Sequence, residues 1–215
     1  RPYTAAERIA VIDRLLAQAD DLGIPRRLIM VDALVLTVSS KAQAARHCLD
    51  TIRHCREVLG LPTTMGLSNV SFGLPARELL NSTFLAMCMA YGMTSCIANP
   101  ASARLRETLA SGEVLLARDP QAGRYIDAFA NWTAAAPVAG AAGGPAAAKG
   151  AATTPGEAVI VGDKAALLAM LEDKLAAGAD PFELVNGELI PAILEVGRKY
   201  ERKEYFLPQL LRSAE

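Results

Sequence analysis

Two polar features in the first part of the chain could bind and orient a small molecule. Asp32 interrupts the apolar run of residues 28–35, and residues 66–75 read GLSNVSFGLP. An ionised carboxylate within an apolar strand is costly unless it is paired, so Asp32 either forms a salt bridge or helix cap or accepts hydrogen bonds from a ligand. The second segment combines two glycines and two serines with Asn69, whose amide both donates and accepts hydrogen bonds. Polar loops between a strand and a helix are common, so this segment alone is weak evidence of a site.

A third feature is the segment YFLPQLLRSAE at residues 205–215. Leu207 and Leu210 are three residues apart, which places them on one face of a helix. Taken alone, the pattern is typical of a helix that begins here and packs its leucines in a core.

Composition excludes several classes of partner. The net charge is −1 and aromatic residues make up 5% of the chain, which argues against nucleic acid or an anionic membrane as the main partner. No apolar run reaches the ~20 residues that a membrane span needs, and the N-terminus lacks the apolar core of a signal peptide.

The cysteines and histidines do not form a metal-binding pattern. The four cysteines are widely spaced, with no C-x-x-C pair, and the two histidines are His47 and His54. A zinc site of the usual spacing is therefore not expected. Four unpaired thiols fit a reducing compartment and predict a cytoplasmic location.

The first part of the chain alternates helical and strand patterns in the order αβαβαβαα. Thr4 and Glu7 predict a capping box, and Gly23 and Pro25 predict the end of the helix that follows it. Strands are expected at residues 28–35, 63–68 and 93–98, and further helices at 40–60, 77–91, 101–116 and 120–132, the last capped by Asp119. Long crossovers favour a parallel arrangement, which would bring Asp32 and Asn69 to one edge, facing one pocket.

Three parallel strands are too few for a closed barrel. The first helix is also preceded by no strand. We therefore expect the chain to begin inside a larger α/β domain, with its edge strand pairing with a segment outside it.

A composition shift divides the chain. Residues 133–156 contain 11 alanines, 5 glycines, 3 prolines and a single charged residue, Lys149, which predicts a linker rather than a helix. The domains are therefore expected at residues 1–132 and 157–215. The second is entirely helical in pattern and resembles a small bundle that stops in mid-pattern at its C-terminus.

Several of these segments resemble one enzyme family. The runs MVDALV at residues 30–35, GLSNVSFGLP at 66–75 with Arg77 and Asn81, and ANP at 98–100 are similar to the last strands of the pterin-binding barrel of methyltetrahydrofolate methyltransferases, which include the cobalamin-dependent methionine synthases. Ala33 stands where the family usually has proline. Residues 196–197 and 205–215 are similar to the four-helix cap that covers the methyl face of cobalamin in that family.

The resemblance implies a fold of two parts. The first is the C-terminal part of a (β/α)8 pterin-binding barrel with three parallel strands, and the second is a truncated four-helix cap bundle. It also implies site residues: Asn69 as the catalytic contact; Asp32, Asn69, Arg77 and Asn99 as pterin-binding residues; and Tyr200, Leu207 and Leu210 as cobalamin-cap residues. The family often has phenylalanine where Tyr200 stands, and no metal ligand is implied.

The implied reaction is methyl transfer from 5-methyltetrahydrofolate to a corrinoid, and onward to homocysteine in the full-length enzyme. In the family a Co(I) corrinoid attacks the methyl group, and the negative charge that develops on the folate nitrogen needs a hydrogen bond or a proton. Asn69 is the candidate for that contact, and Asp32 for orienting the pterin ring.

The implied cofactor is cobalamin, as methylcobalamin, with 5-methyltetrahydrofolate as substrate. The Asp-x-His-x-x-Gly cobalt-ligating module and a homocysteine-binding zinc site are absent from the sequence. The expected partners are these small molecules and the remaining modules of the same enzyme. The alternatives are a non-catalytic pterin- and corrinoid-binding fragment, a methyltetrahydrofolate:corrinoid-protein methyltransferase with a different acceptor, and an α/β scaffold for an unrelated ligand.

Overall fold

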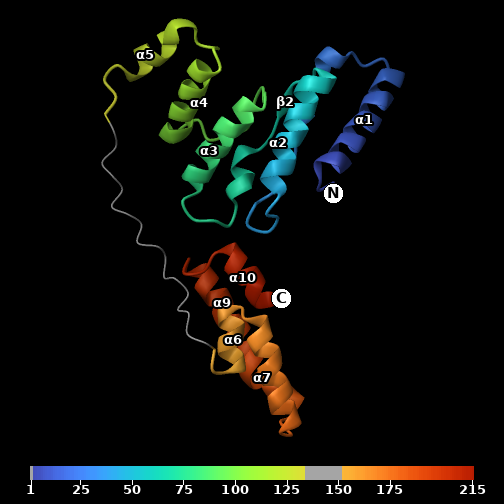
Figure 1. Cartoon of the computed structure of the whole chain (residues 1–215), viewed down its shortest axis with the longest axis vertical. Helices are drawn as coiled ribbons and strands as arrows, with labels where there is room; N and C mark the ends of the chain where they lie inside the picture. The colour runs from blue at the N-terminus through green and yellow to red at the C-terminus, as the bar shows by residue number, and fades with distance from the viewer. Residues whose placement is uncertain (1, 134–151) are drawn as a thin grey trace. The chain divides into compact units, whose positions relative to one another are not determined.

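The computed structural model describes residues 2–133 and 152–215 (Figure 1). The chain divides into two compact units at Trp132 and Thr133. Most of the predicted linker, residues 134–151, lies outside the described residues. The last residues assigned to the linker are helical instead: Thr154 accepts a hydrogen bond from the Glu157 backbone and caps α6 (Pro155–Val161). Proline at the first helical position does not interrupt a helix, which the composition alone did not reveal.

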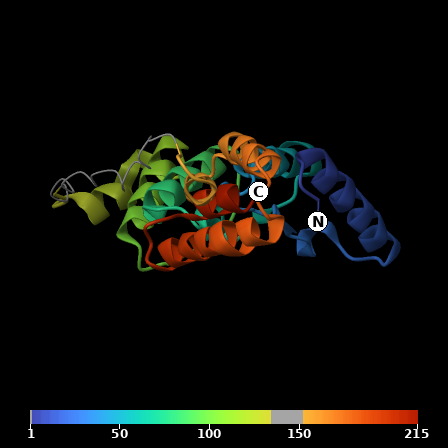
Figure 2. The same cartoon turned by 90° about the horizontal axis from the view of Figure 1, so that it is seen from below.

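The first unit contains five helices among the described residues: α1 (Ala5–Asp21), α2 (Ala44–His54), α3 (Arg77–Ala90), α4 (Ala103–Leu115) and α5 (Gly123–Phe129). Its strands are β1 (Val31–Asp32) and β2 (Thr63–Thr64), and its 3₁₀ or π turns are η1 (Arg26–Leu28), η2 (Cys55–Leu59), η3 (Leu67–Ser71) and η4 (Pro120–Ala122). The predicted capping box is confirmed, because Thr4 and Glu7 exchange hydrogen bonds at the start of α1. α1 lies beside α2 (Figures 1 and 2).

The strands are parallel, as predicted, but much shorter. The amide of Val31 donates to the Pro62 carbonyl over 2.9 Å, and that of Ala33 to the Thr64 carbonyl over 3.0 Å. The expected third strand is present only as a parallel bridge between Gly66 and Ile97. The apolar runs predicted neither strand length nor full burial, since Leu28, Met30 and Ile97 are exposed. β1 ends where Leu34 adopts a left-handed backbone, at φ 52°, and β2 is soon followed by the turn η3.

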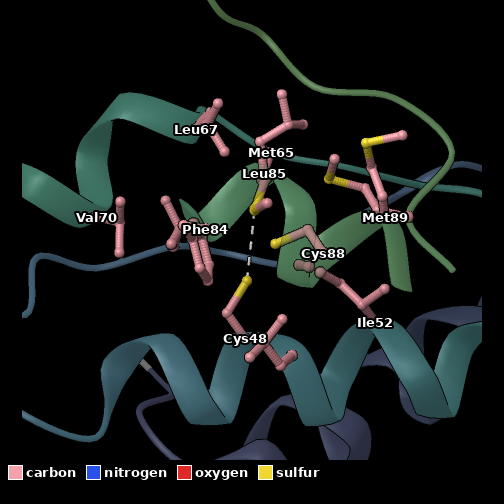
Figure 3. Packing of buried hydrophobic residues seen from close by; sticks show 13 residues of the cluster. Cys48, Ile52, Met65, Leu67, Val70, Phe84, Leu85, Cys88 and Met89 are labelled. Carbon is pink, nitrogen blue, oxygen red and sulfur yellow. Dashed lines mark hydrogen bonds between the residues drawn. The ribbon is translucent and has the colours of Figure 1, made fainter. Parts of the chain in front are cut away.

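Alternate residues of these segments face the helices. Val31, Ala33, Thr63 and Met65 are buried. Ala33 and Met65 pack with side chains of α2 and α3 in the main core cluster, and Val31 packs with side chains of α1 in a second one. Figure 3 shows the centre of the main cluster, where the Cys48 thiol lies 3.5 Å from the Met65 sulfur, between α2 and α3. Asp32 belongs to the other face and is exposed. Its carboxylate is therefore not enclosed in the core, because the described helices cover only one face of β1.

The predicted helix at residues 120–132 begins later than expected. Gln121 and Ala122 have left-handed backbones, at φ 58° and 54°, so α5 begins only at Gly123. Asp119 still caps it, because its carboxylate accepts hydrogen bonds from the backbone amides of Arg124 and Tyr125.

The described part of the second unit is all helical, with α6, α7 (Lys164–Ala176), α8 (Pro181–Leu184), the π turn η5 (Val185–Leu189), α9 (Ile190–Glu201) and α10 (Leu207–Ala214). α6 contacts α7, α9 and α10 (Figure 1). Ala158 of α6 and Val196 of α9 are fully buried. Asp163 caps α7 as predicted, by accepting a hydrogen bond from the Ala166 amide. That these helices form part of a four-helix cap stays a prediction.

Candidate functional site

The polar residues singled out from the sequence follow the carboxyl ends of parallel segments. Asp32 ends β1, Asn69 lies in η3 after β2, and Asn99 follows the bridge at Ile97. Because the segments run in parallel, these three ends lie along the same edge. The backbone thus collects the candidate residues from three separate parts of the sequence.

The loop of residues 66–75 is held by the first turns of α3. The Arg77 guanidinium donates to the Ser68 carbonyl over 2.7 Å and to the Ser71 hydroxyl over 3.0 Å. The Ser71 hydroxyl in turn donates to the Asn81 side-chain oxygen over 2.7 Å. Ser71 and Asn81 are buried, so the bond between them is shielded from water, and it fixes the loop together with the more exposed Arg77 contacts. Arg77 is therefore a clamp on the loop, whatever else it contacts.

A cavity of about 210 Å³ opens beside this clamp. Its lining is Leu67, Ser68, Arg77, Glu78, Asn81, Ala98, Asn99, Ser102 and Leu105. The Asn99 side chain is anchored there by accepting a hydrogen bond from the Ala101 amide over 3.0 Å. The structure therefore brings together two of the predicted site residues, Arg77 and Asn99.

Asn69 is exposed and its amide lies over Gly66. A Cβ atom at position 66 would stand 2.9 Å from the Asn69 side-chain nitrogen, which is closer than real Cβ atoms approach. The Asn69 backbone amide also donates to the Gly66 carbonyl over 3.2 Å. Gly66 is thus the residue that leaves room for the side chain of Asn69.

Asp32 lies at a different cavity. Its carboxylate accepts a hydrogen bond from the Leu34 amide over 2.8 Å and lines a space of about 380 Å³ between α1 and β1. The lining of the Arg77–Asn99 cavity does not include Asp32. The structure therefore places Asp32 on the same edge but does not bring it into that cavity.

Sequence reasoning missed two residues that position the site. Ser71 was quoted only as part of a motif, although it links Arg77 to Asn81. Arg8 was not considered, yet it is only 3% exposed and donates to the Ala33 carbonyl, next to Asp32. The signal for Arg8 was its place four residues before Ile12, on the apolar face of α1.

The three predicted cap residues lie close together in the sequence of the second unit. Tyr200 is in the last turn of α9, Leu207 and Leu210 are in the first turn of α10, and all three are half-buried. α10 is tied to α6, because the Tyr205 and Ser213 hydroxyls both donate to the Ile160 carbonyl. None of the three side chains carries a charge, and their contact with cobalamin stays a prediction.

The described residues contain neither a metal-binding cluster nor a membrane-spanning helix. Within residues 2–133 and 152–215, no three or more histidine, cysteine, aspartate or glutamate side chains are grouped so as to hold a metal ion. In the same residues, no helix combines the length and the apolar character that crossing a membrane requires.

Comparison with known proteins finds a similar family for part of each unit. Residues 4–99 match the pterin binding enzyme family, and residues 156–215 match the B12 binding domain family. The two matches lie on either side of the predicted linker.

Three curated proteins are similar to parts of the chain. A methylcorrinoid:tetrahydrofolate methyltransferase from Eubacterium limosum is 29% identical over 129 residues, which is 60% of this chain and 48% of that protein. Methionine synthases from Mycobacterium tuberculosis and Mycobacterium leprae are each 34% identical over 102 residues, 44% of this chain, and 9% and 8% of their own lengths. The chain thus spans about half of the first relative and about a tenth of the methionine synthases.

Proposed function

We propose that the chain, which matches the pterin binding enzyme family at residues 4–99 and the B12 binding domain family at residues 156–215, takes part in methyl transfer between 5-methyltetrahydrofolate and a corrinoid. The observation that carries the proposal is the loop of residues 66–75. It is fixed by a buried hydrogen-bond network and presents Asn69 at the edge where Asp32 and Asn99 also lie.

We assign the orientation of the pterin to Asp32. Its carboxylate is exposed on the face of β1 that the described helices leave uncovered. One oxygen is engaged by the Leu34 amide, and the carboxylate has further lone pairs for ring amide and amine hydrogens of a pterin. Arg77 and Asn99 line a separate cavity at the same edge, with Arg77 acting chiefly through the loop that it clamps.

In this proposal, Asn69 stabilises the charge that develops on the folate nitrogen during methyl transfer. When the methyl group leaves, the electron pair of the broken bond stays on the folate nitrogen, which then takes a proton from solvent. An amide does not titrate usefully, so Asn69 cannot supply that proton. It stabilises the developing charge by a hydrogen bond that strengthens in the transition state.

The second unit covers the corrinoid in this proposal. A bound corrinoid would supply the cobalt nucleophile that accepts the methyl group. Tyr200, Leu207 and Leu210 would lie against its methyl face and exclude water and oxidants. Their half-buried positions beside the anchored α10 support that role.

The direction of transfer and the final acceptor are separate proposals. The Eubacterium limosum relative is named for transfer from a methylcorrinoid to tetrahydrofolate, whereas the mycobacterial relatives are named for methionine synthesis. We propose transfer from folate to corrinoid, with homocysteine as the final acceptor in a larger enzyme, and retain a different acceptor as the second candidate. The unpaired thiols support a cytoplasmic location.

The test is single-turnover methyl transfer from 5-methyltetrahydrofolate to free cob(I)alamin, followed by the absorbance of cobalamin. The larger enzyme of which the chain is proposed to be a part should transfer the methyl group in its wild-type form. Asn69→Ala should slow the transfer by about 10²–10³, the usual effect of removing one donor to a developing charge, while methyltetrahydrofolate affinity changes little. Unchanged transfer with strongly weakened binding would show that Asn69 is only a ground-state contact.

A further inference from the structure

The Asp32–Leu34 turn has an unusual backbone. Leu34 is a branched residue at φ 52°, in the left-handed region that non-glycine residues avoid. The turn is closed by the hydrogen bond from the Leu34 amide to the Asp32 carboxylate over 2.8 Å. A strained turn of this kind persists only where its surroundings hold it.

Arg8 is the group that holds it. Its guanidinium reaches from α1 and donates to the Ala33 carbonyl over 3.1 Å, across 25 residues of sequence. Ala33 is the middle residue of the turn and is itself buried. The bond therefore fixes the peptide group between Ala33 and Leu34, whose N–H is the donor to the Asp32 carboxylate.

The position of Arg8 is costly for the fold. The side chain is 3% exposed, and burial lowers the pKa of its guanidinium, which nevertheless remains a cation. Within the described residues, its Nε and Nη2 atoms have no hydrogen-bond acceptor. A buried cation with one acceptor adds little to stability compared with an apolar side chain of similar volume. Among the described residues, the guanidinium donates only to the Ala33 carbonyl, so this is the group through which Arg8 can affect the site.

We propose that Arg8 is a positioning residue for Asp32, holding the Ala33 carbonyl so that the turn stays closed and the carboxylate points in one direction. This inference rests on the proposed function, in which Asp32 orients the pterin. It adds a residue from α1, outside the motifs that the sequence singled out, to the machinery of the site.

The test uses the full chain in four forms: wild type, Arg8→Met, Arg8→Lys and Arg14→Met. Arg14 lies on the exposed side of the same helix and receives the same substitution as a matched control. The first readout is hydrogen exchange at the Leu34 amide, which needs no ligand. The second is the Kd for 5-methyltetrahydrofolate.

Arg8→Met should leave the thermal midpoint near that of Arg14→Met, speed exchange at Leu34 severalfold and weaken methyltetrahydrofolate binding by about tenfold. Arg8→Lys keeps a charged donor group, so its Leu34 exchange rate and its methyltetrahydrofolate affinity should lie between those of wild type and Arg8→Met. In an Asp32→Asn background, Arg8→Met should weaken binding little further, because the two residues act as one unit.

Unchanged Leu34 exchange in Arg8→Met would overturn the positioning role, whatever the ligand does. An Arg8→Met chain that does not fold would overturn it as well, since the guanidinium would then serve the fold itself. Failure of the wild-type chain to bind methyltetrahydrofolate would instead overturn the proposed function, a result that the exchange measurement distinguishes.

Discussion

The side-chain nitrogen of Asn69 occupies the space beside Gly66, 2.9 Å from where a Cβ atom of residue 66 would stand. Gly66 has φ −79°, a backbone that any residue can adopt, so the glycine is required for space and not for conformation. The pair therefore offers a way to move the Asn69 amide without deleting it.

Gly66→Ala should displace the Asn69 amide and slow methyl transfer by about tenfold or more, because the hydrogen bond to the developing charge would be misaimed. The free energy of unfolding should change by less than about 1 kcal/mol, since only the end of an exposed side chain has to move. Single-turnover transfer and thermal unfolding measure the two effects.

Gly123→Ala is the matched control for this substitution. An added Cβ there meets nothing within 4 Å, and the position is helical. Equal rates for the two alanine variants would mean that the position of the Asn69 amide does not matter to the reaction.

Ser71→Ala should release the loop of residues 66–75 from α3. The substitution removes the donor to Asn81 and the acceptor of Arg77 within a buried network, and should cost about 1–3 kcal/mol of unfolding free energy. It should also weaken methyltetrahydrofolate binding, because Asn69 loses its support.

Ser111→Ala provides the comparison, since that hydroxyl donates only to the Glu107 carbonyl of its own helix. Denaturant unfolding and ligand titration of both variants distinguish the effect of removing any helix-bound serine hydroxyl from the effect of breaking the Arg77–Ser71–Asn81 network. A Ser71→Ala chain as stable as Ser111→Ala, with full affinity, would refute the clamp.

The four thiols should differ in reactivity. Burial raises the pKa of Cys48 to about 12, and burial also raises the pKa of Cys88. At pH 8 only about 10⁻⁴ of Cys48 would be thiolate, and its labelling should rise about tenfold per pH unit while the chain stays folded. Cys96 is only partly buried and should react first.

Timed labelling with a thiol reagent, followed by mass mapping, tests this order. All four cysteines should react together in denaturant. Native labelling of Cys48 as fast as Cys96 would show that the core around Met65 is not packed as in Figure 3.

Leu207→Ala addresses the cap. If Leu207 covers the corrinoid, its truncation should speed oxidative inactivation of cobalamin in the intact enzyme and leave methyltetrahydrofolate binding unchanged. If Leu207 is ordinary core, truncation should cost about 2–5 kcal/mol of stability.

Leu211→Ala, on the more exposed side of the same helix, is the control. The rate of cobalamin oxidation and the thermal midpoint are measured for both. A large drop in midpoint without faster oxidation would leave Leu207 as packing only.

Local signals in the sequence predicted much of the fold. The Thr4–Glu7 box, the Asp163 cap and the glycines that follow α1, η2 and α3 each depend on a few neighbouring residues. Strand length depended on distant pairing instead. The run at residues 28–35 is apolar apart from Asp32, yet β1 spans only Val31–Asp32 and is followed by the left-handed Leu34.

The sequence predicted only those site residues that belong to a recognisable motif. Asn69, Arg77 and Asn99 were named from the sequence, and the last two do line one cavity. Arg8 was beyond reach because its contact with Ala33 spans 25 residues and depends on how α1 packs against β1. That Asp32 lies outside the Arg77–Asn99 cavity likewise depends on tertiary packing.

The most direct measurement of the central claim is isothermal titration of the chain with 5-methyltetrahydrofolate, compared with p-aminobenzoylglutamate, which lacks the pterin. Asp32→Asn is titrated alongside, because it keeps the shape of the side chain and removes its charge. We predict saturable one-to-one binding of methyltetrahydrofolate, much weaker binding of the truncated compound, and about tenfold loss of affinity in Asp32→Asn. Absence of binding, or equal affinity for both compounds, would contradict a pterin site on this chain.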